Sequence, residues 1–151
     1  MVNSGAEAIR VVALGNDGDG IAQTPQGRVF VPGTMPGDEI VLASQTGTQG
    51  VLEQVVTPGP DRVTPVCSLF GTCGGCRLQH MALTAMMAWK SARVTEALKR
   101  AGFTTLPAPT TRQVSPHGRR RVDLAFRRVD RQIVLGLHRR RGDVVDMTEC
   151  A

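Results

Sequence analysis

The cysteines are the residues of this chain whose type and spacing most directly suggest chemistry. Cys67, Cys73 and Cys76 follow the pattern C-x5-C-x2-C, and Cys150 comes 74 residues after Cys76. Four thiolates are the ligand set of a structural zinc ion or of an iron–sulfur cluster. Within the closest pair lies Gly74-Gly75, where missing side chains let the backbone fold closely around a bulky inorganic group. The spacing therefore predicts a four-thiolate site that ties distant parts of the chain together.

Other uses of these cysteines remain open at this point. Two disulfides are disfavoured if the protein is kept in a reducing compartment. A zinc ribbon normally has two close cysteine pairs, which the five-residue gap after Cys67 does not provide. A redox pair of Cys73 and Cys76 needs a thioredoxin-like strand and helix around it. His80 is a further ligand, a residue that orients the ligands, or a polar residue at the start of a helix.

The net charge of +5 is distributed unevenly along the chain. Acidic residues outnumber basic ones up to Arg62, whereas ten arginines lie in the range 112–141 with only Asp123 and Asp130 among them. Clustered arginines neutralise phosphates and are the main source of affinity for nucleic acids, although a charge run is also typical of a solvated face. The candidate polyanion contacts are Arg119, Arg120, Arg121, Arg139, Arg140 and Arg141.

Aromatic residues are scarce, at 3% of the chain, and there is no tyrosine. Few side chains could therefore stack on unpaired bases. Phe30 and Phe126 alternate with apolar neighbours, so we expect both to face a core. Binding of nucleic acid would then be electrostatic and strongly sensitive to salt. The aromatic candidates are Phe30, Phe70, Phe103, Phe126 and Trp89.

The first sixty residues predict a small β-barrel. Short β-branched runs are separated by glycine- and proline-rich turns, and none of them has a helical period. The turn residues in the range 15–20 are spaced as G-x-x-G-x-G, but no helix follows that could hold a phosphate. Five such strands favour a closed barrel of the OB type, while an SH3-like barrel or an open meander has the same periodicity. The expected strands are 9–14, 21–24, 28–31, 39–43 and 51–56.

A linker and a second segment follow the predicted barrel. Residues 57–60, Thr-Pro-Gly-Pro, cannot continue a strand ladder and mark a boundary, which gives domains 1–60 and 61–151. An apolar stripe beginning at Leu83 predicts an amphipathic helix that ends at Gly102. Alternating residues in 122–126, 133–137 and 144–145 then predict an antiparallel sheet leading to Cys150. The expected fold class is a β-rich α+β protein.

Several motifs together resemble one enzyme family. They are Arg28-Val29-Phe30-Val31-Pro32-Gly33, Pro36-Gly37-Asp38, Cys67-x5-Cys73-Gly74-Gly75-Cys76-Arg77-Leu78-Gln79-His80, Trp89-Lys90 and Thr148-Glu149-Cys150. Together they are similar to the amino-terminal part of the iron–sulfur RNA uracil-5-methyltransferases, in particular those acting on ribosomal RNA. The resemblance covers essentially the whole chain, and its Cys-Gly-Gly-Cys-x-Leu-Gln-His core is the most specific part.

The resemblance implies both a domain organisation and a cofactor. Residues 1–60 would be a TRAM domain, an RNA-binding barrel, and residues 61–151 a central domain. In that domain a 4Fe-4S cluster would be held by the four cysteines. Enzymes of the family use S-adenosylmethionine to methylate carbon 5 of a uridine that has left its stack. The partner implied is RNA, and in particular ribosomal RNA. The cluster ligands implied are Cys67, Cys73, Cys76 and Cys150.

Family members also carry a methyltransferase domain with a nucleophilic cysteine and a catalytic carboxylate, none of which can be assigned to this sequence. With four thiols given to four cluster positions, no thiolate remains to attack a pyrimidine. We therefore expect no catalytic residue and no methyl transfer by these 151 residues alone. No cleavable signal and no long apolar run is found, so the expected state is a cytoplasmic monomer without a membrane partner.

Overall fold

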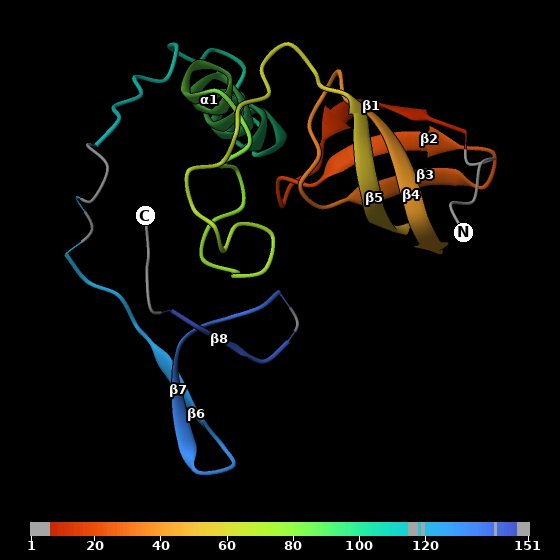
Figure 1. Cartoon of the computed structure of the whole chain (residues 1–151). Helices are drawn as coiled ribbons and strands as arrows, with labels where there is room; N and C mark the ends of the chain where they lie inside the picture. Colours follow the sequence, from red (N-terminus) through yellow and green to blue (C-terminus); the bar gives the residue numbers. More distant parts are fainter. Residues whose placement is uncertain (1–6, 115–117, 119, 141, 148–151) are drawn as a thin grey trace.

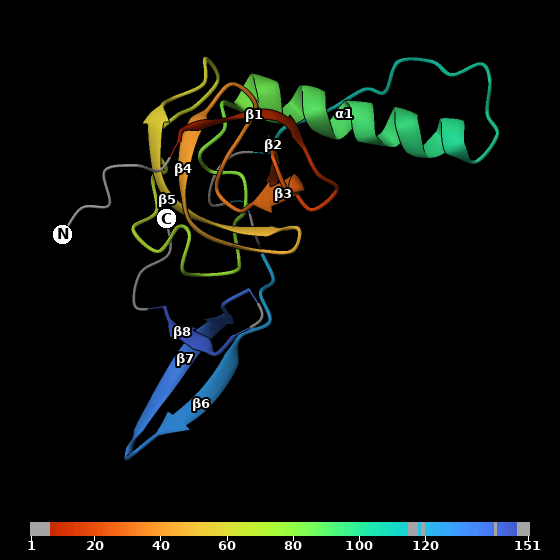
Figure 2. The same cartoon turned by 90° about the vertical axis from the view of Figure 1, so that its right-hand side faces the viewer.

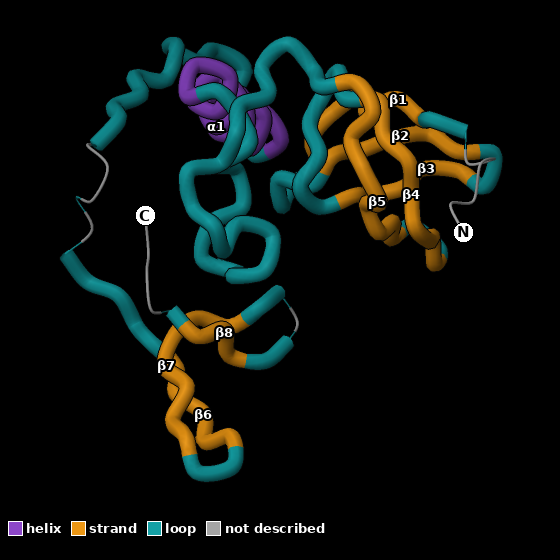
Figure 3. The backbone as a smooth tube through the Cα atoms, viewed as in Figure 1, coloured by secondary structure: helices purple, strands orange, loops and turns teal. Residues whose placement is uncertain are grey.

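The computed structural model describes residues 7–114, 118, 120–140 and 142–147. In this part of the chain the regular elements form a barrel, one helix and a small sheet, joined by long loops (Figures 1 and 3). The barrel strands are β1 (Ile9–Leu14), β2 (Gly20–Thr24), β3 (Gly27–Val31), β4 (Glu39–Thr46) and β5 (Gln49–Thr57). The other elements are α1 (Leu83–Arg100), β6 (Ala125–Val129), β7 (Gln132–His138) and β8 (Val144–Asp146).

The five barrel strands pair in the order β1-β2-β3-β5-β4, and β4 pairs with β1 to close the cylinder. Neighbouring strands run antiparallel, except that β3 and β5 meet in parallel at Phe30 and Gln49. This connectivity is that of the OB-fold. The prediction of a small five-stranded OB-like barrel is therefore confirmed, and because β1 and β4 pair, an open meander is excluded.

Alternation along the strands builds the barrel core. Val11, Ala22, Val29, Val31 and Ile40 are each at most 1% exposed and pack together in one cluster. Successive residues of a strand point to opposite faces, so every second residue of β3 enters this core. Burying such side chains contributes about 1.5–3 kcal/mol for each valine or isoleucine relative to full exposure.

The same alternation directs Phe30 outward. Its neighbours Val29 and Val31 are fully buried, whereas Phe30 is half-buried on the outer surface and lies opposite Ile21 of β2. The expectation that Phe30 faces the core is therefore wrong. Reading β3 as an alternating strand with valines at the core positions would have placed Phe30 correctly.

The predicted linker 57–60 is fastened to the barrel. The carboxylate of Asp38, whose side chain is fully buried, accepts the N–H of Gly59 at 2.8 Å. It also accepts two hydrogen bonds from the Arg62 guanidinium, at 2.9 and 2.7 Å. A Cβ on Gly59 would lie 2.7 Å from the carbonyl oxygen of Pro36, so only glycine fits here. The chain leaves the barrel along a defined path.

Burial and hydrogen bonding shift the pKa of Asp38 in opposite directions. Burial by itself raises the pKa of the Asp38 carboxyl, but the hydrogen bonds from Arg62, Gly59 and the N–H of Met35 outweigh it, and the net pKa is lowered. Arg62 is held in turn by the carbonyl oxygen of Gly33 at 2.7 Å. The pair is therefore ionised and almost fully satisfied, as a buried ion pair must be.

The helix α1 extends away from the barrel (Figure 2). It is amphipathic as predicted, yet none of its residues is buried, and Leu83, Val94 and Leu98 are 48%, 50% and 36% exposed. It ends as predicted at Gly102, which takes φ +94° and donates its N–H to the carbonyl of Lys99. Among the residues that the structure describes, no helix has the length and apolarity needed to cross a membrane.

The strands β6, β7 and β8 form a separate antiparallel sheet in sequence order. The predicted turn at Asp130 is confirmed, with φ +55° at that residue. However, β6 begins only at Ala125, later than the alternating pattern indicated. Phe126 is 77% exposed, so the expectation that it faces a core is wrong. Its cross-strand neighbour Leu135 is also exposed, and nothing in the described chain covers this face.

Candidate metal centre

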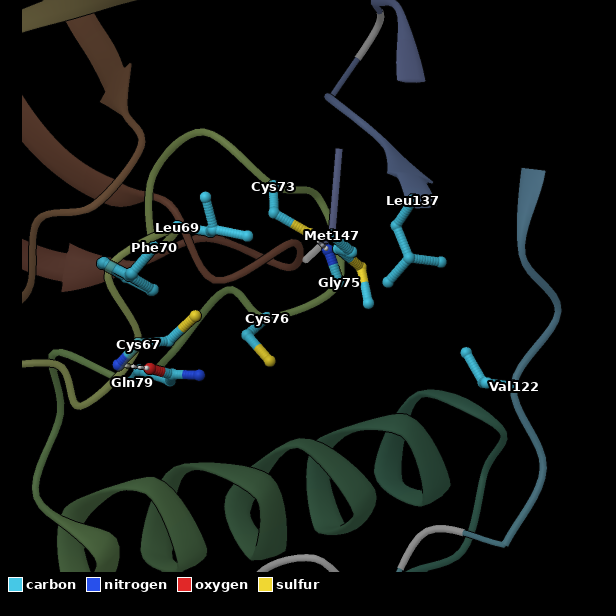
Figure 4. Close-up of a pocket in the computed structure, with 10 residues that line it drawn as sticks. All are labelled: Cys67, Leu69, Phe70, Cys73, Gly75, Cys76, Gln79, Val122, Leu137 and Met147. Atoms are coloured by element: carbon cyan, nitrogen blue, oxygen red, sulfur yellow. Dashed lines mark hydrogen bonds between the residues drawn. The ribbon is translucent and has the colours of Figure 1, made fainter. Parts of the chain in front are cut away.

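Three of the four predicted ligands lie around one cavity. The side chains of Cys67, Cys73 and Cys76 line a cavity of about 230 Å³ between the loop 67–79 and the small sheet (Figure 4). None of the three forms a disulfide. A water molecule takes about 30 Å³ of liquid volume, so the cavity has room for a much larger group.

The rest of the cavity wall is mostly apolar. An apolar wall around thiolates limits water access and stabilises a soft metal centre against hydrolysis and exchange. On the sheet side the wall reaches Met147, the last described residue before the predicted ligand Cys150. The remaining lining residues are Leu69, Phe70, Gly75, Gln79, Val122 and Leu137.

Backbone turns hold the cysteine loop in shape. The N–H of Cys73 donates to the carbonyl of Leu69 at 2.8 Å, and the N–H of Phe70 donates to that of Cys67 at 3.1 Å. Across the loop, the N–H of Cys67 donates to the side-chain oxygen of Gln79 at 3.2 Å. The loop is therefore closed at its ends as well as along its length, which fixes the relative positions of its thiols.

The two glycines between Cys73 and Cys76 let the loop approach β7. The N–H of Gly74 donates to the carbonyl of His138 at 3.0 Å, and a Cβ on Gly74 would lie 2.4 Å from that oxygen. A Cβ on Gly75 would lie 2.6 Å from the Leu137 side chain. The N–H of Gly75 also lies 3.4 Å from Sγ of Cys73, an amide-to-sulfur contact of the kind that tunes iron–sulfur centres. The glycines therefore bring the loop against the sheet as well as around the cavity.

The types of residue that line this cavity are suitable for a soft metal centre. Thiolates select zinc, copper or iron–sulfur clusters, and the apolar wall and the Gly75 amide fit such a group. In the described ranges no group of three or more His, Cys, Asp or Glu is close enough to hold a metal ion. Cys150 lies outside the described residues, so its place as the fourth ligand stays a prediction.

His80 joins the cysteine loop to the barrel. It is fully buried, its Nε2 lies 3.3 Å from the carbonyl oxygen of Thr34, and its ring stands 5.4 Å from that of Phe70. Because a carbonyl only accepts, Nε2 carries the hydrogen, and Nδ1 has no hydrogen-bond partner in the described part of the chain. His80 therefore serves as packing between the two parts.

Burial is the largest influence on the ionisation of His80, and it lowers the pKa. The hydrogen bond to Thr34 raises the pKa of His80, the Arg62 cation lowers it further, and the Asp38 carboxylate raises it. The net result is a pKa below the ordinary value of 6.5. In the unfolded chain the imidazole regains its ordinary pKa. Between the two values the unfolded state binds more protons, so stability falls as the pH drops below about 6.5.

The free energy of unfolding of the unmodified chain should fall between about pH 7.5 and about pH 5.5, and His80→Gln should reduce that fall. Urea unfolding at the two pH values measures it. An unchanged dependence in His80→Gln would contradict the assignment.

Three arginines from different segments converge on the β1–β2 turn at residues 16–19. Arg77 comes from the cysteine loop, Arg93 from α1 and Arg140 from the segment after β7. Arg77 donates to the carbonyl of Asp17 at 3.3 Å. Arg93 donates to Oδ1 of Asn16 at 2.5 Å, and Arg140 donates to Oδ1 of Asp19 at 2.5 Å. The acidic turn therefore holds the basic second half of the chain against the barrel.

The predicted polyanion contacts fall into different environments. Arg120, Arg121 and Arg139 are exposed, and Arg121 has an interaction within the chain. Arg140 is half-buried and paired with Asp19. Arg119 and Arg141 lie outside the described residues. The role of the six arginines as polyanion contacts therefore stays a prediction.

An OB-like barrel beside a thiol-lined cavity defines the chain as a barrel protein with a candidate soft-metal centre. No family model matches it. Over 99% of its length it is 34% identical to an uncharacterized RNA methyltransferase of Brucella suis. It is 39% identical, over 94% of its length, to one of Caulobacter vibrioides. A Vibrio vulnificus protein named 23S rRNA (uracil(1939)-C(5))-methyltransferase RlmD is 31% identical over 95% of the chain.

The chain is therefore a homologue of RNA methyltransferases, which confirms the resemblance seen in its motifs. It spans about a third of the length of these relatives, 36% of the Brucella protein and 35% of the other two. The activity of the complete relatives therefore supports a proposal for this chain but does not establish its function.

Sequence reasoning missed the residues that join the two halves. Asp38, Arg62 and Asp19 carry no motif of a catalytic or metal site, and their partners lie far away in sequence. Asp38 follows the turn residues Pro36 and Gly37, where an aspartate is common, so no local pattern indicates that its side chain is buried.

Proposed function

We propose that this chain is the RNA-binding and cluster-holding portion of an S-adenosylmethionine-dependent RNA uracil-5-methyltransferase that acts on ribosomal RNA. Homology to RNA methyltransferases supports the reaction class, and the relative named for a 23S rRNA uracil supports the substrate. In this proposal residues 1–60 are a TRAM-like RNA-binding domain and residues 61–151 are an iron–sulfur central domain. The protein acts as a monomer in the cytoplasm, without a membrane partner.

The observation that carries the proposal is the convergence of three thiols on one apolar cavity. Cys67, Cys73 and Cys76 would hold a 4Fe-4S cluster there, with Cys150 as the fourth ligand. When bound, the cluster would link the cysteine loop to the chain segment that follows β8. The chain's own part is to present three cysteine side chains from one closed loop, and the hydrogen bond that the Cys67 N–H donates to the Gln79 side chain helps to hold that loop closed.

The reach of the backbone is compatible with Cys150 as the fourth ligand. Met147 lines the cavity, and its N–H is tied to the carbonyl of Leu135 at 3.0 Å. Three further residues span at most about 11 Å when fully extended. The chain between Met147 and Cys150 is therefore long enough for the proposed ligand to approach the cavity that Met147 lines.

In this proposal the 151 residues do not supply the groups that carry out methyl transfer. With all four cysteines given to the cluster, no thiolate remains to attack carbon 6 of a uracil, which activates carbon 5 for methylation. S-adenosylmethionine would accordingly be used only by a complete enzyme. The contribution of the 151 residues is to bind RNA and to hold the barrel and the cysteine loop in a fixed relative position.

Salt dependence of RNA binding tests this function. An oligouridylate of about ten nucleotides should bind the chain more weakly as salt rises, with a slope of about 0.7 for each phosphate contact. Replacing Arg119, Arg120 and Arg121 together by glutamine should lower both affinity and slope. The triple lysine variant keeps the charges and should retain most of the slope. Salt-independent binding would contradict an electrostatic RNA interface.

A further inference from the structure

The cavity that the three thiols line has two walls from different parts of the chain. The loop 67–79 carries the thiols, and the sheet side contributes Leu137 of β7 and Met147 (Figure 4). The hydrogen bond from the Gly74 N–H to the carbonyl of His138 joins the two walls directly. The loop, all of which the structure describes, has no helix or strand of its own. Its position against the sheet therefore depends on further contacts.

The β1–β2 turn of the barrel, residues 16–19, binds the loop side of the cavity. Arg77, which directly follows the last cysteine of the loop, donates to the carbonyl of Asp17 at 3.3 Å. Gly18 has φ +83°, and a Cβ on it would lie 3.0 Å from the side chain of Leu78. The turn therefore packs closely against the residues that come after the thiols.

The same turn binds the sheet side through a largely buried ion pair. Nη1 of Arg140 lies 2.5 Å from Oδ1 of Asp19, and the two side chains are 28% and 9% exposed. The hydrogen bond to Asp19 is the main reason that the pKa of Arg140 is raised above its ordinary value. Arg140 lies two residues beyond His138, whose carbonyl receives the Gly74 N–H. Asp19 therefore holds the strand end against which the loop rests.

We propose that the β1–β2 turn is a clamp that holds the two walls of the candidate metal centre together, with Asp19 as its positioning residue. The inference rests on the proposed function, to which it adds a role for the barrel at the metal centre. Arg77 and Arg140 come from opposite walls, yet one turn binds both of them. Closure of the cavity therefore depends on the barrel as well as on the loop and the sheet.

The clamp gives Asp19 a role that differs from that of a metal ligand. Asp19 is not among the residues that line the cavity, and it acts through Arg140. Loss of the ion pair leaves the thiols in place but lets the sheet separate from the loop more often. Local opening of this kind depends on the contacts of the segment that moves, so it can increase while the rest of the fold stays intact.

Alkylation of the half-buried thiols Cys67 and Cys73 tests the clamp. The chain is purified without oxygen, freed of metal by a chelator and treated with iodoacetamide, and mass spectrometry measures each cysteine separately. Asp19→Asn keeps the size of the side chain and removes its charge, so both thiols should react at least about fivefold faster. Arg140→Gln should have the same effect. The double variant should react no faster than either single variant, because both changes remove one contact.

Asp17→Asn is the matched control, because it removes the same charge from the same turn. The Asp17 carboxylate is 72% exposed and lies 4.0 Å from Arg140, and its backbone carbonyl still accepts the hydrogen bond from Arg77. Alkylation rates should therefore stay within about twofold of wild type. Circular dichroism shows whether the barrel is folded. If Asp19→Asn unfolds it, Arg140→Gln decides the question, since Arg140 lies outside the barrel.

Wild-type alkylation rates in folded Asp19→Asn and Arg140→Gln, or equal acceleration in Asp17→Asn, would overturn the clamp even if the chain binds iron. A chain purified without iron whose thiols still react faster in Asp19→Asn would contradict the proposed cluster and leave the clamp standing. Where iron is bound, a chelator should remove it at least about fivefold faster from Asp19→Asn than from the unmodified chain.

Discussion

Asp38→Asn should lower the free energy of unfolding by about 3–5 kcal/mol, because it leaves the Arg62 cation largely buried without its partner. The Arg62 side chain is only 18% exposed, so water cannot fully replace the carboxylate. The substitution also weakens the hydrogen bond from the Gly59 N–H, which holds the chain as it leaves the barrel. Urea or thermal unfolding measures the loss.

A surface ion pair supplies the control. Arg127 and Asp143 are 2.5 Å apart, but their side chains are 48% and 75% exposed, so Asp143→Asn should cost much less. Equal losses from Asp38→Asn and Asp143→Asn would contradict the role of the buried pair. Because the pKa of Asp38 is lowered on folding, its contribution is complete above about pH 3.8. It is lost as the pH falls through the still lower folded value.

Replacing one cysteine of the loop by alanine should abolish stable cluster binding. Cys76→Ala removes a thiolate that a 4Fe-4S cluster requires, and the remaining ligands cannot complete the site. Iron bound per chain should therefore fall to a small fraction of the wild-type content, and Cys150→Ala should have the same effect. Iron analysis and visible absorbance of protein purified without oxygen measure it.

Ser68→Ala is the matched control for the cysteine variants. Ser68 is an exposed neighbour of Cys67 on the same loop, and its hydroxyl is not among the cavity residues. Iron content should therefore stay at the wild-type value. Full iron content in Cys150→Ala would show that the fourth ligand comes from elsewhere. Full iron content in Cys76→Ala would show that Cys76 of the loop is not a cluster ligand.

Most of the architecture could be predicted from local patterns. The barrel strands follow alternation and glycine turns, and α1 follows its apolar stripe and the Gly102 stop. These features depend on residues close together in sequence, where propensity and periodicity act. Cys67, Cys73 and Cys76 border one cavity, and the metal site that their spacing predicts stays a prediction.

Long-range placement could not be predicted in the same way. Phe30 was assigned to a core because its neighbours are apolar, yet the core face of β3 was taken by Val29 and Val31. Arg140 was predicted only as a polyanion contact, and its pairing with Asp19 across 121 residues has no local signal. Contacts of this kind depend on how the barrel and the sheet meet, which the sequence pattern does not encode.

The most direct test of the central claim is the content of iron and acid-labile sulfide in the unmodified chain purified without oxygen. The proposal predicts about four iron and about four sulfide per chain, with a brown colour that is lost on exposure to air. A colourless protein carrying a single zinc ion, or no metal, would contradict it and would leave a nucleic-acid-binding module without a cluster.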